Sequence, residues 1–156
     1  MKQSSGSVIT RSAYDTEHFG EQIGAQLRGG EVIDLSSDVG GGKTTLVRGI
    51  VRGVGSSDVV ASPTFTVSKL YGADDFSIVH FDFYRIQHDV VTVAHELAEA
   101  TQDATSVVLI EWSETVRDLL PEQTIVMVLQ PISETERQIT WYCPSEKEYV
   151  FAQVES

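Results

Sequence analysis

Apolar positions along this chain follow two spacings, one typical of helices and one typical of strands. Helical spacing, together with capping and stop signals, predicts helices over residues 12–30, 43–55 and 89–100. Strand signals cover residues 31–36, 65–71, 76–81, 106–112, 124–129 and 137–143. The turn Gly72-Ala73-Asp74-Asp75 is typical of a hairpin between the second and third strands. The mixture of segments predicts an α/β fold in a single domain over residues 1–156.

A glycine-rich segment lies where the first predicted strand meets the second predicted helix. Gly40, Gly41 and Gly42 leave backbone N–H groups uncovered by side chains. Lys43 adds a flexible ammonium group, and Thr44 adds a hydroxyl that can bind Mg²⁺. Such a segment can hold a chain of phosphates. The candidate nucleotide-binding residues are Ser37, Asp38, Val39, Gly40, Gly41, Gly42, Lys43, Thr44, Thr45 and Trp112.

One position departs from the usual phosphate-loop pattern, G-x-x-x-x-G-K-[ST]. The pattern begins with a glycine, and this chain has Ser37 at that position. If the backbone there needs a positive φ, a side chain costs about 1 kcal/mol or more. Nucleotide affinity therefore depends on how the loop accommodates Ser37.

Two acidic residues end strand patterns and are candidates for the chemistry of a phosphate site. Asp82 follows the strand 76–81, and Glu111 ends the sequence V-V-L-I-E. Ligands of open α/β sheets bind at the carboxyl ends of strands, where the glycine-rich loop and Glu111 are both expected. The candidate catalytic residues are Lys43, Asp82 and Glu111, and the candidate Mg²⁺ ligands are Thr44, Asp82 and Glu111. Asp82 is interpreted equally well as a turn acid.

Three other side chains have simpler interpretations. His80 lies in a strand pattern without a second His or Cys at zinc spacing, which favours a structural histidine over a metal ligand. Trp112 is expected to be partly buried, and it could also stack on a base. Cys143 is the sole cysteine and is expected to be a core thiol, which excludes an internal disulfide.

The charge of the chain limits its direct partners. Asp and Glu number 23 against 11 Lys and Arg, giving a formal net charge of -12. A broad footprint on nucleic acid is therefore not expected from this chain alone. The amino terminus lacks the apolar run of a signal peptide, and no segment has the length of a membrane span. We expect a cytoplasmic protein without membrane contact.

Four segments together resemble the TsaE family, small bacterial P-loop ATPases needed for threonylcarbamoyladenosine modification of tRNA. In family order they are D-V-G-G-G-K-T-T-L-V-R-G, S-P-T-F-T, H-F-D-F-Y-R and I-E-W. The first is shared by many NTPases, whereas the other three are much more specific. The resemblance implies a P-loop NTPase-like three-layer sandwich with a mixed, mostly parallel central sheet and an antiparallel hairpin.

The resemblance also implies roles for particular residues. Lys43 would contact the β and γ phosphates of ATP, and Thr44 would bind Mg²⁺. Asp82 and Glu111 would complete the shell around the metal and a water molecule. Trp112 would lie near the nucleotide.

Partners follow from the same resemblance. The chain would be an ATPase, slow in isolation, that binds the complex of TsaD and TsaB, and it would meet tRNA only through that complex. A switch-like loop facing the phosphates would contain Ser62, Thr64 and Thr66. Tyr84 and Arg85 would lie near the partner-facing surface.

Other functions remain compatible with a glycine-rich phosphate loop. A small-molecule kinase would use an arginine-rich lid, and basic residues are few between residues 69 and 137. A GTPase is disfavoured because no N-K-x-D motif occurs. A non-hydrolysing nucleotide-binding adaptor is the third alternative, and Ser37 is the residue that supports it.

Overall fold

The computed structural model describes residues 2–37, 41–61, 68–84 and 90–154. The predicted strands and helices are present, with bounds that differ from the predictions by a few residues in most cases. In chain order the elements are β1 (Gln3–Thr10), α1 (Ala13–Gly24), β2 (Val32–Ser36), α2 (Lys43–Val54), β3 (Ser68–Gly72), β4 (Ser77–Asp82), α3 (Val90–Gln102), β5 (Ser106–Glu111), η1 (Ser113–Thr115), η2 (Arg117–Leu119), β6 (Ile125–Pro131), β7 (Arg137–Pro144) and η3 (Ser145–Phe151).

The strands form one sheet in the order β1-β7-β6-β2-β5-β4-β3. The central strands β6, β2, β5 and β4 pair in parallel. Antiparallel pairs add β7 and β1 at one edge and β3 at the other. The predicted mixed sheet and the antiparallel hairpin of β3 and β4 are therefore confirmed, and the parallel pairs lie at the centre of the sheet.

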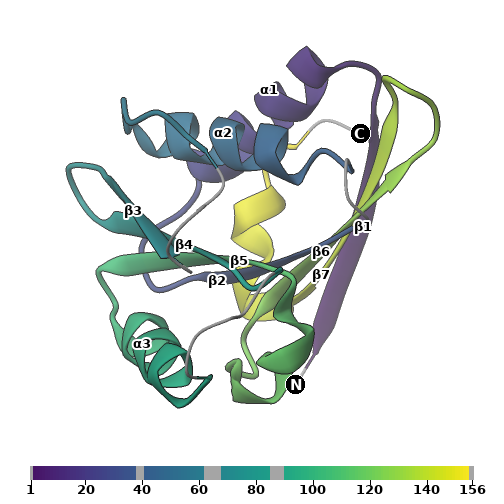
Figure 1. The fold of residues 1–156 in the computed structure, drawn as a ribbon. Coiled ribbons are helices and arrows are strands. Elements are labelled where there is room, and N and C mark those ends of the chain that lie inside the picture. Colours follow the sequence, from purple (N-terminus) through teal and green to yellow (C-terminus); the bar gives the residue numbers. More distant parts are fainter. Residues whose placement is uncertain (1, 38–40, 62–67, 85–89, 155–156) are drawn as a thin grey trace.

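Helices cover both faces of this sheet, with α1 and α2 on one side and α3 on the other (Figure 1). The larger core joins α1 and α2 to side chains such as Ile33 and Leu109. The smaller core joins Val93 and Leu97 of α3 to Val108 on the opposite face of β5. Alternate residues of the buried strands thus serve two cores, which confirms the three-layer sandwich.

The helices α1 and α2 meet through glycines. A Cβ added to Gly49 would overlap the carbonyl oxygen of Glu17, and one added to Gly53 would overlap that of Glu21. The two helix backbones are therefore in direct contact, and a larger side chain at either glycine would push them apart. This close contact holds α2, and with it the loop that precedes α2, against α1.

Several elements of the fold differ from the sequence-based expectations. The strand β1 has no counterpart among the predicted strands, because its serine-rich sequence shows little apolar alternation. The segment η3 also lies outside the predicted elements. The first helix ends at Gly24, whereas the pattern predicted a helix up to residue 30. Gly29 and Gly30 instead form a turn with φ values of 100° and 88°. Across the described residues, no helix is long and apolar enough to cross a membrane.

Candidate phosphate-binding site

The glycine-rich loop connects the end of β2 with the first turn of α2. The helix begins at Lys43, and Gly42 is its N-cap with a φ of 97°. This left-handed conformation is one that glycine adopts without the steric cost of a Cβ. The first turn of a helix leaves N–H groups without partners inside the helix and carries a partial positive charge. The predicted order of strand, loop and helix is confirmed.

The backbone at Ser37 lies outside the left-handed region. Among the described residues other than glycine, a positive φ occurs only at Trp112. The carbonyl oxygen of Ser37 accepts a hydrogen bond from Lys43 Nζ at 3.4 Å. The conformational cost expected for a side chain at this position therefore does not arise in this structure.

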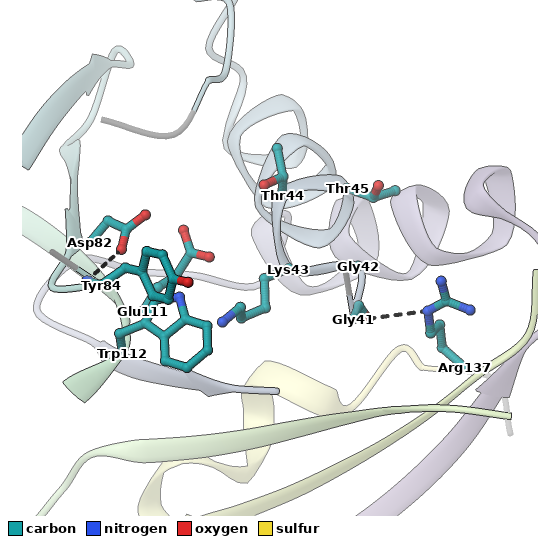
Figure 2. A pocket seen from close by; sticks show the side chains of 10 residues that line it. All are labelled: Gly41, Gly42, Lys43, Thr44, Thr45, Asp82, Tyr84, Glu111, Trp112 and Arg137. Carbon is teal, nitrogen blue, oxygen red and sulfur yellow. Dashed lines mark hydrogen bonds between the residues drawn. The ribbon is translucent and has the colours of Figure 1, made fainter. Parts of the chain in front are cut away.

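A cavity of about 400 Å³ opens beside the loop. It is lined by Gly41, Gly42, Lys43, Thr44, Thr45, Asp82, Tyr84, Glu111, Trp112 and Arg137. Figure 2 shows the two carboxylates and both aromatic rings on one side of Lys43, with Arg137 on the other side near Gly41. We call the side with the two carboxylates the acidic end of the cavity, and the side with Arg137 the arginine end.

The ammonium group of Lys43 is held at the acidic end. Its Nζ lies 3.9 Å from the centroid of the Trp112 ring, a geometry that favours a cation–π interaction. The φ of Trp112 is 58°, a conformation that costs about 1–2 kcal/mol for a residue with a side chain. The Tyr84 and Trp112 rings lie 4.8 Å apart, centroid to centroid. Trp112 is thus a neighbour of the cation and lies away from the arginine end.

The two carboxylates stand opposite each other in the register of β4 and β5, but they are held differently. Asp82 Oδ1 accepts a hydrogen bond from the Tyr84 N–H at 3.0 Å, a contact that a turn acid and a cavity carboxylate can both make. Burial raises the pKa of Asp82; the Tyr84 N–H opposes this rise and the charge of Glu111 adds to it. Glu111 is more deeply buried, at 3% exposure, and its Oε2 lies 2.6 Å from His80 Nε2.

The structure brings most of the described candidates together around one cavity. Ser37 contributes through its carbonyl contact with Lys43 and is not part of the cavity wall. The remaining candidates, which lie outside the described residues, are Asp38, Val39, Gly40, Ser62, Thr64, Thr66 and Arg85.

Arg137 begins β7 and lines the cavity, a position that the sequence pattern does not predict. Its Nε donates a hydrogen bond to the Gly41 carbonyl oxygen at 3.2 Å. Its Nη1 donates to the carbonyl oxygens of Ser133, Glu134 and Glu136. Residue spacing offers no signal for this contact, because the pairing of β7 with β6 brings Arg137 to a loop that is distant in sequence.

The fold and this site define an α/β protein of the P-loop NTPase-like type, with a glycine-lysine loop at the carboxyl ends of parallel strands. Residues 10–139 match the family model described as threonylcarbamoyl adenosine biosynthesis protein TsaE. The chain belongs to the TsaE family, and its role therefore lies in tRNA threonylcarbamoyladenosine biosynthesis.

Individual relatives agree with this assignment. The tRNA threonylcarbamoyladenosine biosynthesis protein TsaE of Treponema pallidum is 34% identical, over 85% of this chain and 96% of the relative. The protein of the same name from Bacillus subtilis is 29% identical, over 81% of this chain and 78% of the relative. The crystal structure of YdiB from Bacillus subtilis superposes with a TM-score of 0.79 at 25% identity, covering 96% of this chain and 93% of that one. The family and the fold expected from the sequence are confirmed.

Proposed function

We propose that this chain is the ATP-binding and ATP-hydrolysing subunit of the tRNA threonylcarbamoyladenosine machinery, acting on a complex of TsaD and TsaB homologues. One observation carries the proposal. The start of α2, with Lys43, faces Asp82 and Glu111 across a single cavity. Phosphoryl transfer depends on positioning and on charge stabilisation, and these residues supply both.

The position of Lys43 orients ATP within the cavity. A phosphate-loop lysine reaches the β and γ phosphates, so the γ phosphate belongs at the acidic end. The α phosphate and the nucleoside then extend towards Thr45 and the arginine end. This orientation favours a role for Trp112 beside the phosphates over stacking on the base, because its ring already packs against the Lys43 ammonium.

The residues at the acidic end suit Mg²⁺. This ion commonly binds one or two carboxylates together with phosphate oxygens and water, and does not need an all-protein cage. Asp82, Glu111 and the Thr44 hydroxyl line the same cavity. No cluster of three or more acidic, His or Cys side chains suited to a metal occurs in the described part of the chain, so the proposed ion would need phosphate oxygens and water as further ligands. When bound, Mg²⁺ neutralises charge that develops on the phosphate oxygens.

The side chains of this chain perform the remaining steps. Lys43 leaves the Trp112 ring and the Ser37 carbonyl and places its charge on the transferred phosphate. Glu111 orients the attacking water from its buried position next to the cavity. Asp82 accepts a hydrogen bond from the Tyr84 N–H, and burial raises its pKa. A cation bound nearby would oppose this rise and favour the ionised carboxylate.

The charge of the chain is compatible with an indirect role in tRNA chemistry. A net charge of -12 disfavours direct contact with the tRNA backbone. The resemblance to the TsaE family implies that TsaD and TsaB transfer the threonylcarbamoyl group. Tyr84 is 52% exposed and lines the cavity. We propose that this part of the cavity faces the partner complex, which would bring partner residues close to the bound phosphates.

The first test measures nucleotide binding by isothermal titration calorimetry with Mg²⁺ and ATP. Lys43→Ala should lower the affinity at least tenfold, because it removes the ammonium group that pairs with the β and γ phosphates. Lys2→Ala removes the same charge from an exposed position and is the matched control. Equal affinities for the wild type and the Lys43 variant would contradict the proposal.

The second test measures steady-state ATP hydrolysis by the chain alone and after adding TsaD and TsaB. Turnover is expected to be slow alone and faster in the complex, because P-loop enzymes often need a completing group supplied in trans. Binding without turnover under both conditions would support the non-hydrolysing adaptor. Phosphate transfer to a hydroxyl-bearing acceptor would support the kinase.

A further inference from the structure

The buried environment of Glu111 contains a histidine that sequence reasoning treated as structural. His80 lies two residues before Asp82 on β4, so both side chains point to the face of the sheet that α2 covers. The His80 side chain is fully buried, and its Nε2 lies 2.6 Å from Glu111 Oε2. Because a carboxylate oxygen can only accept here, Nε2 carries the proton and donates.

The other side of the imidazole ring is held by Tyr71. The Tyr71 hydroxyl lies 3.5 Å from His80 Nδ1 and donates a hydrogen bond to the Ala61 carbonyl oxygen at 3.0 Å. Tyr71 is fully buried, and its ring centroid lies 6.1 Å from that of His80. The imidazole is therefore packed against Tyr71 on one side and bonded to Glu111 on the other, so it has little freedom to rotate.

A buried pair of Glu111 and His80 stabilises the core less than apolar side chains of similar volume would. Burying a charged carboxylate next to an imidazole carries a desolvation cost that well-packed apolar side chains would avoid. Within the described residues, His80 supplies the one hydrogen bond to the Glu111 carboxylate. Glu111 also forms part of the cavity wall. The pair therefore fixes the direction of a carboxylate that meets the cavity.

We propose that His80 is the positioning residue of Glu111, and that Tyr71 fixes the imidazole from behind. The inference rests on the proposed ATPase function, since it assigns His80 to the orientation of the carboxylate that holds the attacking water. His80 does not touch the nucleotide, so its loss should lower kcat and leave nucleotide affinity nearly unchanged. In metal sites, loss of a residue that orients a ligand typically costs 10- to 100-fold.

The test compares kcat and KM for ATP in the complex with TsaD and TsaB. His80→Leu keeps an apolar volume and removes the donor, and it should lower kcat about 10- to 100-fold with KM changed less than about threefold. His80→Gln retains an N–H₂ donor and should recover most of the lost rate. Ile78→Val is the matched control, because Ile78 is fully buried on the same strand and face but lies outside the cavity.

A double variant separates positioning from general damage to the core. In a Glu111→Gln background, His80→Leu should cause little further loss of kcat, since both changes affect the same step. The inference is overturned if the wild type hydrolyses ATP and His80→Leu lowers kcat no more than Ile78→Val does. Additive losses in the double variant would also overturn it. If the wild type does not hydrolyse ATP with or without partners, the proposed function fails, and this inference fails with it.

Discussion

Two glutamates at opposite ends of the central strands are buried to a similar extent but differ in their hydrogen-bond partners. Glu31 precedes β2 and is fully buried, while Glu111 ends β5 and is 3% exposed. Glu31 accepts hydrogen bonds from the N–H groups of Arg28 and Gly29 and from the Tyr149 hydroxyl. Its two oxygens are thus occupied by the turn and by η3.

Glu111 has a different set of partners. Among the described residues only His80 bonds to its carboxylate, and the side chain borders the cavity. A buried carboxylate with several fixed donors stabilises the fold. One with a single donor and access to a cavity retains capacity for a ligand or water. The number of hydrogen bonds, more than burial, distinguishes Glu111 from Glu31.

The largest expected effect is that of Glu111→Gln on ATP turnover. The amide cannot act as a base or hold the attacking water in the same way, so kcat should fall on the order of 10²- to 10³-fold. Nucleotide affinity should change little, because Lys43 and the loop remain. Single-turnover hydrolysis and calorimetry on the same preparation measure the two properties. A variant that loses affinity and keeps its rate would reverse the roles assigned to Lys43 and Glu111.

The second prediction concerns Glu31. Glu31→Gln replaces a carboxylate that accepts from Arg28, Gly29 and Tyr149 with an amide that leaves part of this set unpaired. The free energy of unfolding should fall by about 2 kcal/mol, as measured by urea denaturation. ATP affinity should remain at the wild-type value. Glu122→Gln, at an exposed position, is the control and should leave stability within about 0.5 kcal/mol.

A normal unfolding curve for Glu31→Gln would contradict the comparison, as would a large loss of stability in Glu111→Gln equal to that of Glu31→Gln. Either result would mean that hydrogen-bond saturation does not distinguish a structural carboxylate from one that serves the cavity.

Arg137 provides a third and smaller test at the arginine end. Arg137→Gln removes the bond from Nε to the Gly41 carbonyl and most of the anchoring of the β6–β7 turn. Without this bond the free energy needed to order the loop reduces the free energy of phosphate binding. ATP affinity should therefore fall about five- to tenfold, which corresponds to roughly 1 kcal/mol of binding free energy. Arg11→Gln is the control, because Arg11 pairs with Glu136 of the same turn but makes no contact with Gly41.

Titration with inorganic tripolyphosphate shows how Arg137 acts. If Arg137 stabilises the loop, affinities for tripolyphosphate and ATP should fall by the same factor. A loss confined to ATP would show instead that Arg137 contacts the nucleoside.

The sequence predicts well the features that depend on neighbouring residues. The loop from Gly41 to Thr44, the start of α2 and the placement of Asp82 and Glu111 at strand ends all follow from local patterns. The contacts of His80 and Arg137 depend on strand register and on which strands are adjacent, and a linear pattern does not encode either. The sequence pattern does not predict the polar strand β1 for a related reason, since pairing with β7 stabilises this strand more than its own apolar residues do.

Asp34 is a third buried carboxylate that can be compared with Glu31 and Glu111. Its replacement is expected to have the smallest effect of these predictions. It lies on β2, is 3% exposed, and its Oδ1 has no hydrogen-bond partner among the described residues. Burial raises the pKa of Asp34, while the Ser113 hydroxyl and the charge of Arg117 oppose the rise. Asp34 is therefore unsaturated like Glu111, but it lies outside the cavity that contains Lys43.

Its pH dependence follows from the direction of this shift. A carboxyl whose pKa is raised on folding binds its proton more tightly in the folded state, so its unfavourable contribution disappears as the pH falls through the folded pKa. Asp34→Asn is neutral at every pH and should increase the unfolding free energy at pH 7 by about 1 kcal/mol. The gain should shrink as the pH is lowered, whereas the exposed control Asp118→Asn should show no such trend. Urea denaturation at a series of pH values measures how the unfolding free energies of the wild type and the variants depend on pH. A variant that is less stable than the wild type at pH 7 would show that the Asp34 charge stabilises the fold.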